Sequence, residues 1–355
     1  MNVVRTTPPR PFDIAAVFPE LGPLARTAIR LHPRPGPVTW HDSSVGGPLL
    51  WPVDEPWPYC DLPHESTSDI ALADLRLQQR VRASEAAFPD GDPHPPHYTA
   101  EERAVRDRLD SEETWLDGSW LDGPVAMVPL AQLYLRDVPV PCPPGRAGVD
   151  LLQVLWCPFD HPPEHYMPRS VVVWRSAAAV TEVLVSPPEP PVVVEEYVPE
   201  PCVVSPEQVR EYPNPADLSK ELRDRIEDWS IRQAAAVAVE GGYEPYPESD
   251  YGSHLSGAPG WKVGGWPMWG YADPTPRPCS VCGTETEPLL TITSSEWDAG
   301  NGSWIPYEDQ AAASCAPRDR RDMQHPTRVQ IADCVTQQIY ICPAAVEHPH
   351  IELMQ

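Results

Sequence analysis

The chain carries the same short pattern in each of its two halves. Val45-Gly46-Gly47-Pro48-Leu49-Leu50-Trp51 is matched by Val263-Gly264-Gly265-Trp266-Pro267-Met268-Trp269, and the tryptophan lies five residues after the first glycine in both. A cysteine follows at Cys60 in the first copy and at Cys279 in the second. Ordered landmarks at near-equal spacing are the mark of a repeated structural unit. The sequence therefore predicts two related halves.

The segments that close the two copies predict buried strands. Leu151–Cys157 and Gln338–Cys342 are short and rich in β-branched and aromatic residues, and a glutamine precedes the cysteine by four residues in both. Further strand candidates are Thr27–Leu31, Val125–Leu133, Val171–Trp174 and Pro288–Thr293. The 49 prolines interrupt most long helical windows, because proline lacks the backbone donor that a helix needs. We therefore expect an α+β fold dominated by β-structure, with two pseudo-repeated antiparallel β halves and inserted helices.

Insertions and a proline-rich connection set the expected domain limits. The first half is expected to span residues 1–185. Within it, residues 69–116 have helix-forming composition, and Thr99 and Glu102 have the spacing of a capping box. We therefore expect a helical insertion over 69–116. Residues 186–215 are crowded with prolines and acidic residues, which is typical of a semi-rigid connection. The second half, 216–355, opens on a helix expected over 215–239. Its apolar residues recur every three or four positions, at Leu218, Leu222, Ile226 and Trp229.

Cysteines and histidines in both halves have the spacing of metal ligands. Cys279 and Cys282 are separated by two residues, so both sulfurs can face one ion, and Cys342 and His348 complete a candidate zinc site. In the first half, Cys60 with His64 and Cys157 with His161 each have three residues between them, and His165 is an alternative to His161. We expect one to two structural zinc ions with four protein ligands each. The alternative is buried thiols beside solvated histidines. The remaining cysteines are expected to be ordinary thiols: Cys142, Cys202, Cys315 and Cys334.

Four tryptophans lie close to the Gly-Gly turns, at Trp51, Trp57, Trp266 and Trp269. They are candidates to line a groove for an extended peptide or a small ligand, because aromatic side chains dominate binding energetics. The alternative is that they belong to the core.

No catalytic residue is expected. His41-Asp42-Ser43 contains the residue types of a hydrolytic triad, but adjacent residues do not converge by default and no Gly-x-Ser-x-Gly elbow accompanies them. The sequence also lacks a Walker loop, a dinucleotide-binding glycine pattern and a His-Glu-x-x-His motif.

The chain is strongly acidic, with 26 Lys and Arg against 52 Asp and Glu and a formal net charge of −26. Such a charge repels nucleic-acid phosphates and favours a basic protein or peptide as partner. The alternative is that the acidity serves only solubility. Met1–Arg10 contains no apolar signal segment and no window is long and apolar enough for a membrane span, so we expect a cytoplasmic protein.

Several of these motifs resemble a known family. Ser43–Pro48 with Trp57-Pro58, then Ala131-Gln132, then Lys262–Pro267 follow the order of signatures in the YwqG-like family of uncharacterised bacterial proteins, a domain of unknown function. The resemblance spans roughly residues 31–342, and the second half departs from it at Thr291-Ile292-Thr293, where a glutamine would be expected. It implies a mixed fold dominated by antiparallel β-structure and no established activity.

The Gly-Gly-x-Pro, Cys-x-x-Cys and Gln-strand arrangement is also similar to programmed-cell-death-protein-like chaperones of a ribosomal protein. An acidic chain would suit a basic client of that kind, although a likeness of fold says little about function. We therefore expect a non-enzymatic interaction protein, chaperone-like or immunity-like, that binds a basic partner. The alternative is an enzyme or a small-ligand-binding protein with a tryptophan-lined cleft between the halves.

Overall fold

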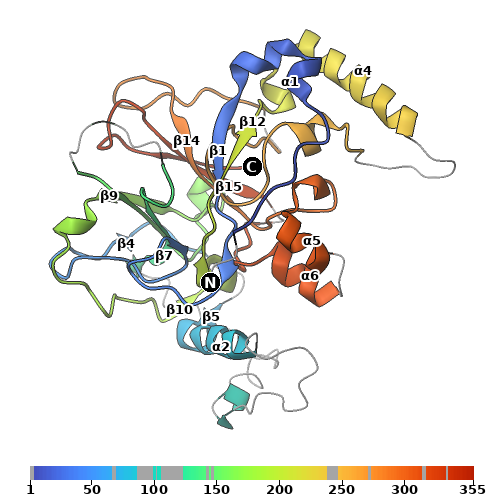
Figure 1. Ribbon diagram of the computed structural model, residues 1–355. Coiled ribbons are helices and arrows are strands. Elements are labelled where there is room, and N and C mark those ends of the chain that lie inside the picture. The colour runs from blue at the N-terminus through green and yellow to red at the C-terminus, as the bar shows by residue number, and fades with distance from the viewer. Residues whose placement is uncertain are drawn as a thin grey trace.

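Two antiparallel β-sheets form the centre of the protein, with helices around them (Figure 1). The computed structural model describes residues 4–65, 69–85, 99–100, 102–104, 123–140, 144, 148–237, 247–270, 273–313, 317–332 and 335–355. Both large sheets of these residues have six strands. The expected β-dominated α+β fold is confirmed. In the same residues, no helix combines the length and the apolar composition that crossing a bilayer requires.

The first sheet has the strand order β2-β11-β3-β7-β8-β9. Its strands are β2 (Arg34–Pro35), β3 (Ser44–Val45), β7 (Val128–Tyr134), β8 (Leu151–Trp156), β9 (Ser170–Arg175) and β11 (Cys202–Val203). The second sheet has the order β12-β1-β13-β14-β15-β16. Its strands are β1 (Arg26–Arg30), β12 (Glu207–Glu211), β13 (Lys262–Gly264), β14 (Glu287–Thr293), β15 (Thr336–Ile341) and β16 (Ile351–Met354). Five of the six strands predicted from the sequence are present within a few residues of their expected limits. The sixth, predicted over Val125–Leu133, is divided into β6 (Val125–Ala126) and β7, which belong to different sheets.

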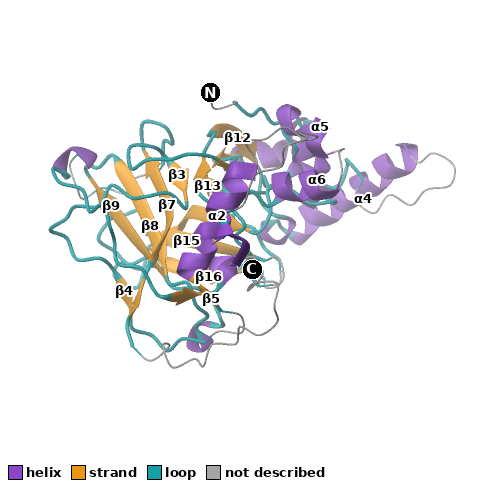
Figure 2. Ribbon diagram, turned by 90° about the horizontal axis from the view of Figure 1, so that it is seen from below, coloured by secondary structure: helices purple, strands orange, loops and turns teal. Residues whose placement is uncertain are grey.

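Short pairs of strands and the helices complete the described part of the chain. β4 (Tyr59–Cys60) pairs with β6 (Val125–Ala126), and β5 (Ile70–Ala71) pairs with β10 (Val192–Val193). The helices are α1 (Ile14–Val17), α2 (Leu72–Glu85), α4 (Lys220–Val237), α5 (Gln310–Ala313) and α6 (Pro317–Gln324). Figure 2 shows the large sheets on one side of the molecule and α4, α5 and α6 on the other.

The predicted helices are present in shortened form. The helix expected over 215–239 is α4, and a separate 3-10 turn, Pro215–Asp217, precedes it because the Asn214 side chain caps that turn and Leu218 is extended. In the insertion, Thr99 and Glu102 form the predicted capping box: the Thr99 hydroxyl accepts from the Glu102 N–H at 3.1 Å, and the Glu102 carboxylate accepts from the Thr99 N–H at 2.6 Å. The rest of residues 86–116, apart from 99–100 and 102–104, lies outside the described residues, as do 238 and 239.

Equivalent hydrogen bonds hold the two copies of the repeat. The Gln153 amide donates to the Leu50 carbonyl at 3.0 Å, and the Gln338 amide donates to the Met268 carbonyl at 2.7 Å. Leu50 and Met268 each precede the repeated tryptophan. The first glycines of the two turns also have nearly the same left-handed φ, +67° at Gly46 and +68° at Gly264. These matches support the duplication on which the sequence interpretation depends.

Thr291 occupies the place of the missing glutamine. Gln132 pairs with Gln153 across β7 and β8, and Thr291 pairs with Gln338 across β14 and β15. In the first half, Gln132 accepts from the N–H of Leu50 at 2.7 Å. In the second half, Gln338 itself accepts from the corresponding N–H of Met268 at 3.1 Å, so a single glutamine makes both bonds and position 291 is free to be threonine.

A two-stranded ribbon belongs to both sheets. β1 pairs with β12 from Arg26↔Glu211 to Arg30↔Glu207, and β2 pairs with β11 at Arg34↔Val203 and Pro35↔Cys202. Between these pairs, the Ser205 N–H donates to the Leu31 carbonyl at 2.8 Å. Segments 26–35 and 202–211 therefore run side by side from one sheet into the other. The domain limits at 185 and 216 stay a prediction. The first sheet takes β11 from the segment between these limits, and the second sheet takes β12 from that segment and β1 from the first half.

Apolar side chains of the two sheets pack into a common core. It contains Leu130 and Trp156 from the first sheet and Leu290 and Ile339 from the second, each no more than 1% exposed. Burial of large side chains contributes about 1.5–3 kcal/mol each. Because the core and the ribbon both join the two sheets, we expect the sheets to unfold together.

Charged side chains are buried where the ribbon passes between the sheets. Arg34 forms an ion pair with Asp309, and both are buried. The ring of His32, which is fully buried, lies 3.0 Å from a Glu207 oxygen through Nε2 and 3.7 Å from a Glu296 oxygen through Nδ1. His32 itself has a left-handed backbone, with φ at +45°. Buried charges are tolerated when they are paired, so this cluster fixes how the ribbon crosses.

His32 makes folding stability sensitive to acid. Burial, together with the nearby Arg30 charge, lowers its pKa to about 4. The pKa in the unfolded chain is about 6.5, so the unfolded state binds more protons between about pH 6.5 and about pH 4, and stability falls as the pH drops through this range by up to about 3 kcal/mol. Urea unfolding at several pH values measures this loss. His32→Asn, which tolerates the left-handed backbone, should flatten the profile; an unchanged profile in that variant would assign the acid sensitivity to other groups.

Candidate metal centres

The structure brings the eight predicted metal ligands together in two tetrads. One contains Cys60, His64, Cys157 and His161, and the other contains Cys279, Cys282, Cys342 and His348. Within each tetrad, one ligand atom from every residue lies within 4.8 Å of the others. The alternative ligand His165 belongs to neither tetrad; it takes a left-handed backbone at the end of the 3-10 turn Pro162–Glu164. We call these groups the first and the second tetrad.

The first tetrad lies where two strands end. Cys60 is the last residue of β4, and Cys157 directly follows β8. The Cys60 sulfur lies 3.7 Å from Nε2 of His161, and Nδ1 of His161 lies 3.0 Å from the Pro63 carbonyl. Because a carbonyl oxygen only accepts, Nδ1 carries the proton and the lone pair of Nε2 faces the sulfur. This is how metal-binding histidines are oriented by their outer partners.

His64 completes the first tetrad from the loop after β4. Its ring centroid lies 5.0 Å from that of His161, and its Nε2 is buried with no hydrogen-bond partner among the described residues. A buried imidazole nitrogen without a partner costs free energy unless a metal or a donor satisfies it. This atom is therefore an independent indication of a ligand at the tetrad.

The second tetrad joins a tight turn to the end of β15. The turn 279–282 is closed by a hydrogen bond from the Gly283 N–H to the Cys279 carbonyl at 2.8 Å, and Gly283 has a left-handed φ of +73° that glycine adopts readily. Cys342 directly follows β15. The Cys342 sulfur lies 3.4 Å from the Cys282 sulfur and 3.2 Å from Nδ1 of His348. Nδ1 of His348 is also 3.5 Å from the Cys279 sulfur.

These distances fit a tetrahedral zinc ion. Zn–S bonds of about 2.3 Å and Zn–N bonds of about 2.0 Å place neighbouring ligand atoms about 3.3 to 3.8 Å apart in a tetrahedron. Four ligand pairs lie between 3.2 and 3.7 Å apart, one in the first tetrad and three in the second. All ligand atoms of a tetrad lie within 4.8 Å of one another. Sulfur and imidazole nitrogen are also the ligands that zinc prefers. Both tetrads can therefore bind a metal such as zinc, each with four protein ligands.

The thiols are electrostatically prepared for a cation. The hydrogen bond with Cys157 lowers the pKa of Cys60, and burial raises the pKa of Cys157, so one sulfur of the pair ionises first. Contacts with Thr284 lower the pKa of Cys282 to about 6, whereas burial raises that of Cys342. Metal ligands must be deprotonated, and in each tetrad the contacts of one cysteine shift its pKa in the direction that favours the thiolate.

The candidate tryptophans make hydrogen bonds inside the protein. Trp51 and Trp57 are buried with ring centroids 5.1 Å apart, and their indole N–H groups donate to the carbonyls of Glu55 and Met127. Trp266 and Trp269 are half-buried and donate to the Leu24 carbonyl and the Asp217 carboxylate. Arginines stack on both, Arg26 at 3.9 Å and Arg277 at 4.8 Å from the ring centroids. These contacts favour packing over ligand binding.

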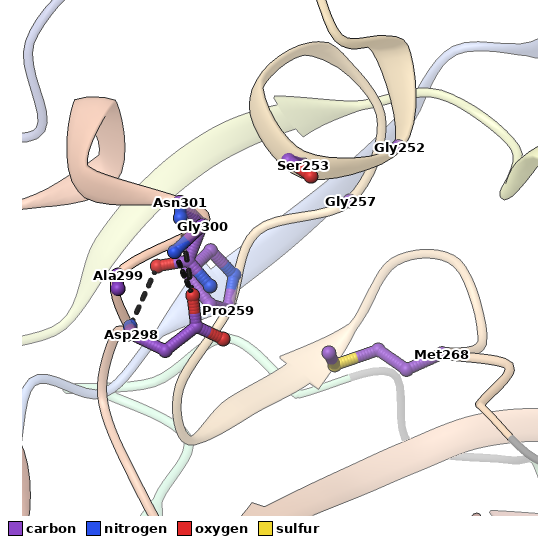
Figure 3. Close-up of a pocket in the computed structure, with 9 residues that line it drawn as sticks. All are labelled: Gly252, Ser253, Gly257, Pro259, Met268, Asp298, Ala299, Gly300 and Asn301. Carbon is purple, nitrogen blue, oxygen red and sulfur yellow. Dashed lines mark hydrogen bonds between the residues drawn. The ribbon is translucent and has the colours of Figure 1, made fainter. Parts of the chain in front are cut away.

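Two cavities in the described part of the chain lie away from the tetrads and from these four tryptophans. One, of about 330 Å³, is lined by Gly252, Ser253, Gly257, Pro259, Met268 and residues 298–301 (Figure 3). Its Asp298 carboxylate accepts from the backbone N–H groups of Gly300 and Asn301, which fixes that loop. The other, of about 420 Å³, runs along α4 between Ile226 and Tyr251. Their linings contain no cluster of metal ligands.

Of the four cysteines expected to be ordinary thiols, the structure describes one, Cys202. Cys202 is fully buried in β11, lies 3.4 Å from the Pro326 carbonyl, and has its pKa raised by burial, as an ordinary thiol would. Cys142, Cys315 and Cys334 lie outside the described residues.

The sequence interpretation missed the buried charges between the sheets. Arg30 interrupts the apolar pattern of the strand that was predicted over Thr27–Leu31, and this was the available signal. Its partners come from distant segments: its guanidinium donates to the Thr7 hydroxyl and the Trp304 carbonyl.

Comparison with known protein families and with curated proteins finds no relative of this chain. No protein-family description matches the chain, and no curated protein matches it significantly.

Proposed function

We propose that this chain is a non-enzymatic binding protein, stabilised by two structural zinc ions, that receives a basic protein or peptide. The observation that carries the proposal is that each tetrad offers four protein ligand atoms. A zinc ion with four protein ligands has no open position for a reacting water or a substrate, which separates structural from catalytic sites. The metals would then hold strand ends in place.

The charge of the chain supports a basic partner. Acidic residues outnumber basic ones by 52 to 26. Among the described residues, the buried charged side chains are nearly balanced, with Arg30, Arg34 and Lys262 against Glu200, Glu211, Glu296 and Asp309. The negative excess of the described residues therefore lies mostly on side chains that solvent reaches, and such charge attracts cationic partners and speeds their association. The similarity of the sequence motifs to those of programmed-cell-death-protein-like chaperones of a ribosomal protein agrees with this proposal, because an acidic chain would suit a basic client of that kind.

Salt-dependent capture tests the proposal. The tagged, zinc-loaded chain is incubated with cell lysate at low and at high salt, and an unrelated globular protein of similar negative charge serves as the control. We expect a basic protein to be retained at low salt by this chain and not by the control, because screening weakens such contacts at high salt. Equal retention by the control, or no salt-sensitive partner, would contradict the proposal.

An enzyme or small-ligand protein stays the alternative prediction, although the cavity beside Met268 and Asp298 is not lined by the four candidate tryptophans. Binding of a metabolite in that cavity, detected as a rise in melting temperature that Asp298→Ala abolishes, would favour a small-ligand protein whose site differs from the predicted tryptophan-lined cleft.

A further inference from the structure

The two tetrads differ in how far their sulfurs are exposed. Cys60 and Cys157 are 3% and 0% exposed. In the second tetrad, Cys279 and Cys342 are also buried, but Cys282 is exposed. Among the six cysteines that the structure describes, Cys282 is the one that solvent reaches freely. A dissolved oxidant therefore meets the second tetrad first.

Cys282 also has a partner sulfur within reach. Its sulfur lies 3.4 Å from the Cys342 sulfur, and a disulfide bond is about 2.05 Å long, so an approach of about 1.4 Å joins them. The position next to Cys282 on this turn borders open space. A Cβ on the neighbouring Gly283 would meet no atom within 4 Å.

We propose that Cys282 is a site of oxidation by hydroperoxides, and that Cys342 then forms a disulfide with it, so that the second tetrad releases its metal while the first keeps it. The disulfide rests on the positions of the sulfurs alone. The release of metal rests, in addition, on the zinc in the proposed function.

The reaction needs a hydroperoxide as the oxidant. With hydrogen peroxide, the Cys282 thiolate attacks one peroxide oxygen, an S–O bond forms, the O–O bond breaks, and hydroxide leaves; an organic hydroperoxide loses its alkoxide at this step instead. The Cys342 thiolate then attacks the Cys282 sulfur, the S–S bond forms, and the oxygen leaves as a second hydroxide. Each sulfur loses one electron and the peroxide gains two, and solvent protonates both hydroxides to water.

Loss of two thiolates dismantles the second tetrad. Only Cys279 and His348 remain as ligands, and structural zinc is held by four. In the first tetrad, the same chemistry is hindered because both sulfurs are buried. The chain would thus contain one metal centre that responds to oxidant and one that does not.

Peroxide treatment of the zinc-loaded full chain tests the inference. Released zinc is followed with a chromogenic chelator, and disulfides are mapped by mass spectrometry after alkylation and proteolysis. We expect release of half of the bound zinc, a linked pair of peptides that contain Cys282 and Cys342, and recovery after dithiothreitol and added zinc. Release of all the zinc, release of none, or a disulfide between other cysteines would overturn the inference.

A ligand-preserving variant separates oxidation from loss of folding. Cys282→His removes the sulfur and leaves a nitrogen ligand at the turn, and its zinc content is measured before peroxide is added. After peroxide, Cys342 should remain a free thiol in this variant, and the fraction of its zinc that is released should fall well below that of the wild type. Cys202→Ser, at a buried thiol outside both tetrads, should respond like the wild type. Release from Cys282→His at the wild-type level would disprove the role of Cys282. If the purified chain holds no zinc, the proposed function fails, and the disulfide map still decides the oxidation.

Discussion

Purified protein is expected to contain two zinc ions per chain, and chelation is expected to lower its melting temperature by about 10 °C or more. Each ion ties segments that are far apart in the sequence: the first joins the ends of β4 and β8, and the second joins the turn 279–282 to the end of β15. Binding to the folded state alone stabilises it by about 4 kcal/mol when free zinc exceeds Kd a thousandfold. In a chain of this size each kcal/mol shifts the melting temperature by about 2–4 °C. Elemental analysis and thermal unfolding measure both quantities.

Paired substitutions assign each ion to its tetrad. Cys279→Ser with Cys282→Ser should leave one zinc per chain, and Cys60→Ser with Cys157→Ser should leave the other. Both should melt earlier than the wild type. Cys202→Ser gives the cost of a buried thiol-to-hydroxyl change without loss of a ligand. Protein that is free of metal and equally stable would remove the zinc hypothesis for both tetrads.

The tetrads were predictable because the repeat indicated where the remaining ligands lie, which a single Cys-x-x-Cys motif does not. Cys279 and Cys282 alone indicate half a zinc site, and the matched positions of Cys157 and Cys342 pointed to the strand ends where the other ligands lie. The choice between His161 and His165 could not be made from spacing, since both follow Cys157 closely. The rigid Pro162-Pro163 turn decides it, because it directs His161 inward and leaves His165 at its far end.

The assembly of the sheets could not be predicted from local patterns. The strand at Arg26–Arg30 was expected, but nothing near it shows that it pairs with residues 207–211 and 262–264, because register depends on contacts far apart in sequence. The segment 186–215 contains β10, β11 and β12. Its prolines and charges indicated a connection, and its short strands were too brief to give a periodic signal.

A buried ion pair in the second sheet gives the largest expected effect of a single substitution. Nζ of Lys262 lies 2.6 Å from Oε1 of Glu211, and both side chains are fully buried. The ammonium also donates to the Trp266 carbonyl, and the Glu211 carboxylate accepts from the N–H groups of Ala258 and Trp266. The pair therefore links β12 and β13 to the Gly-Gly-Trp turn of the repeat. Gly265 is required there, because a Cβ would collide with the Glu211 carboxylate.

Lys262→Met should lower the free energy of unfolding by about 3–5 kcal/mol, because it leaves the Glu211 charge buried without its cation. Glu211→Gln should also destabilise, since it leaves the ammonium uncompensated, and the double variant should lose less than the sum of the two because neither charge remains. Lys220→Met removes an exposed pair with Asp224 and should change stability by less than about 1 kcal/mol. Urea unfolding of the four variants measures these differences. A loss below about 1 kcal/mol in Lys262→Met would show that water reaches Glu211 and replaces the lysine, and the turn would then be held by its backbone hydrogen bonds alone.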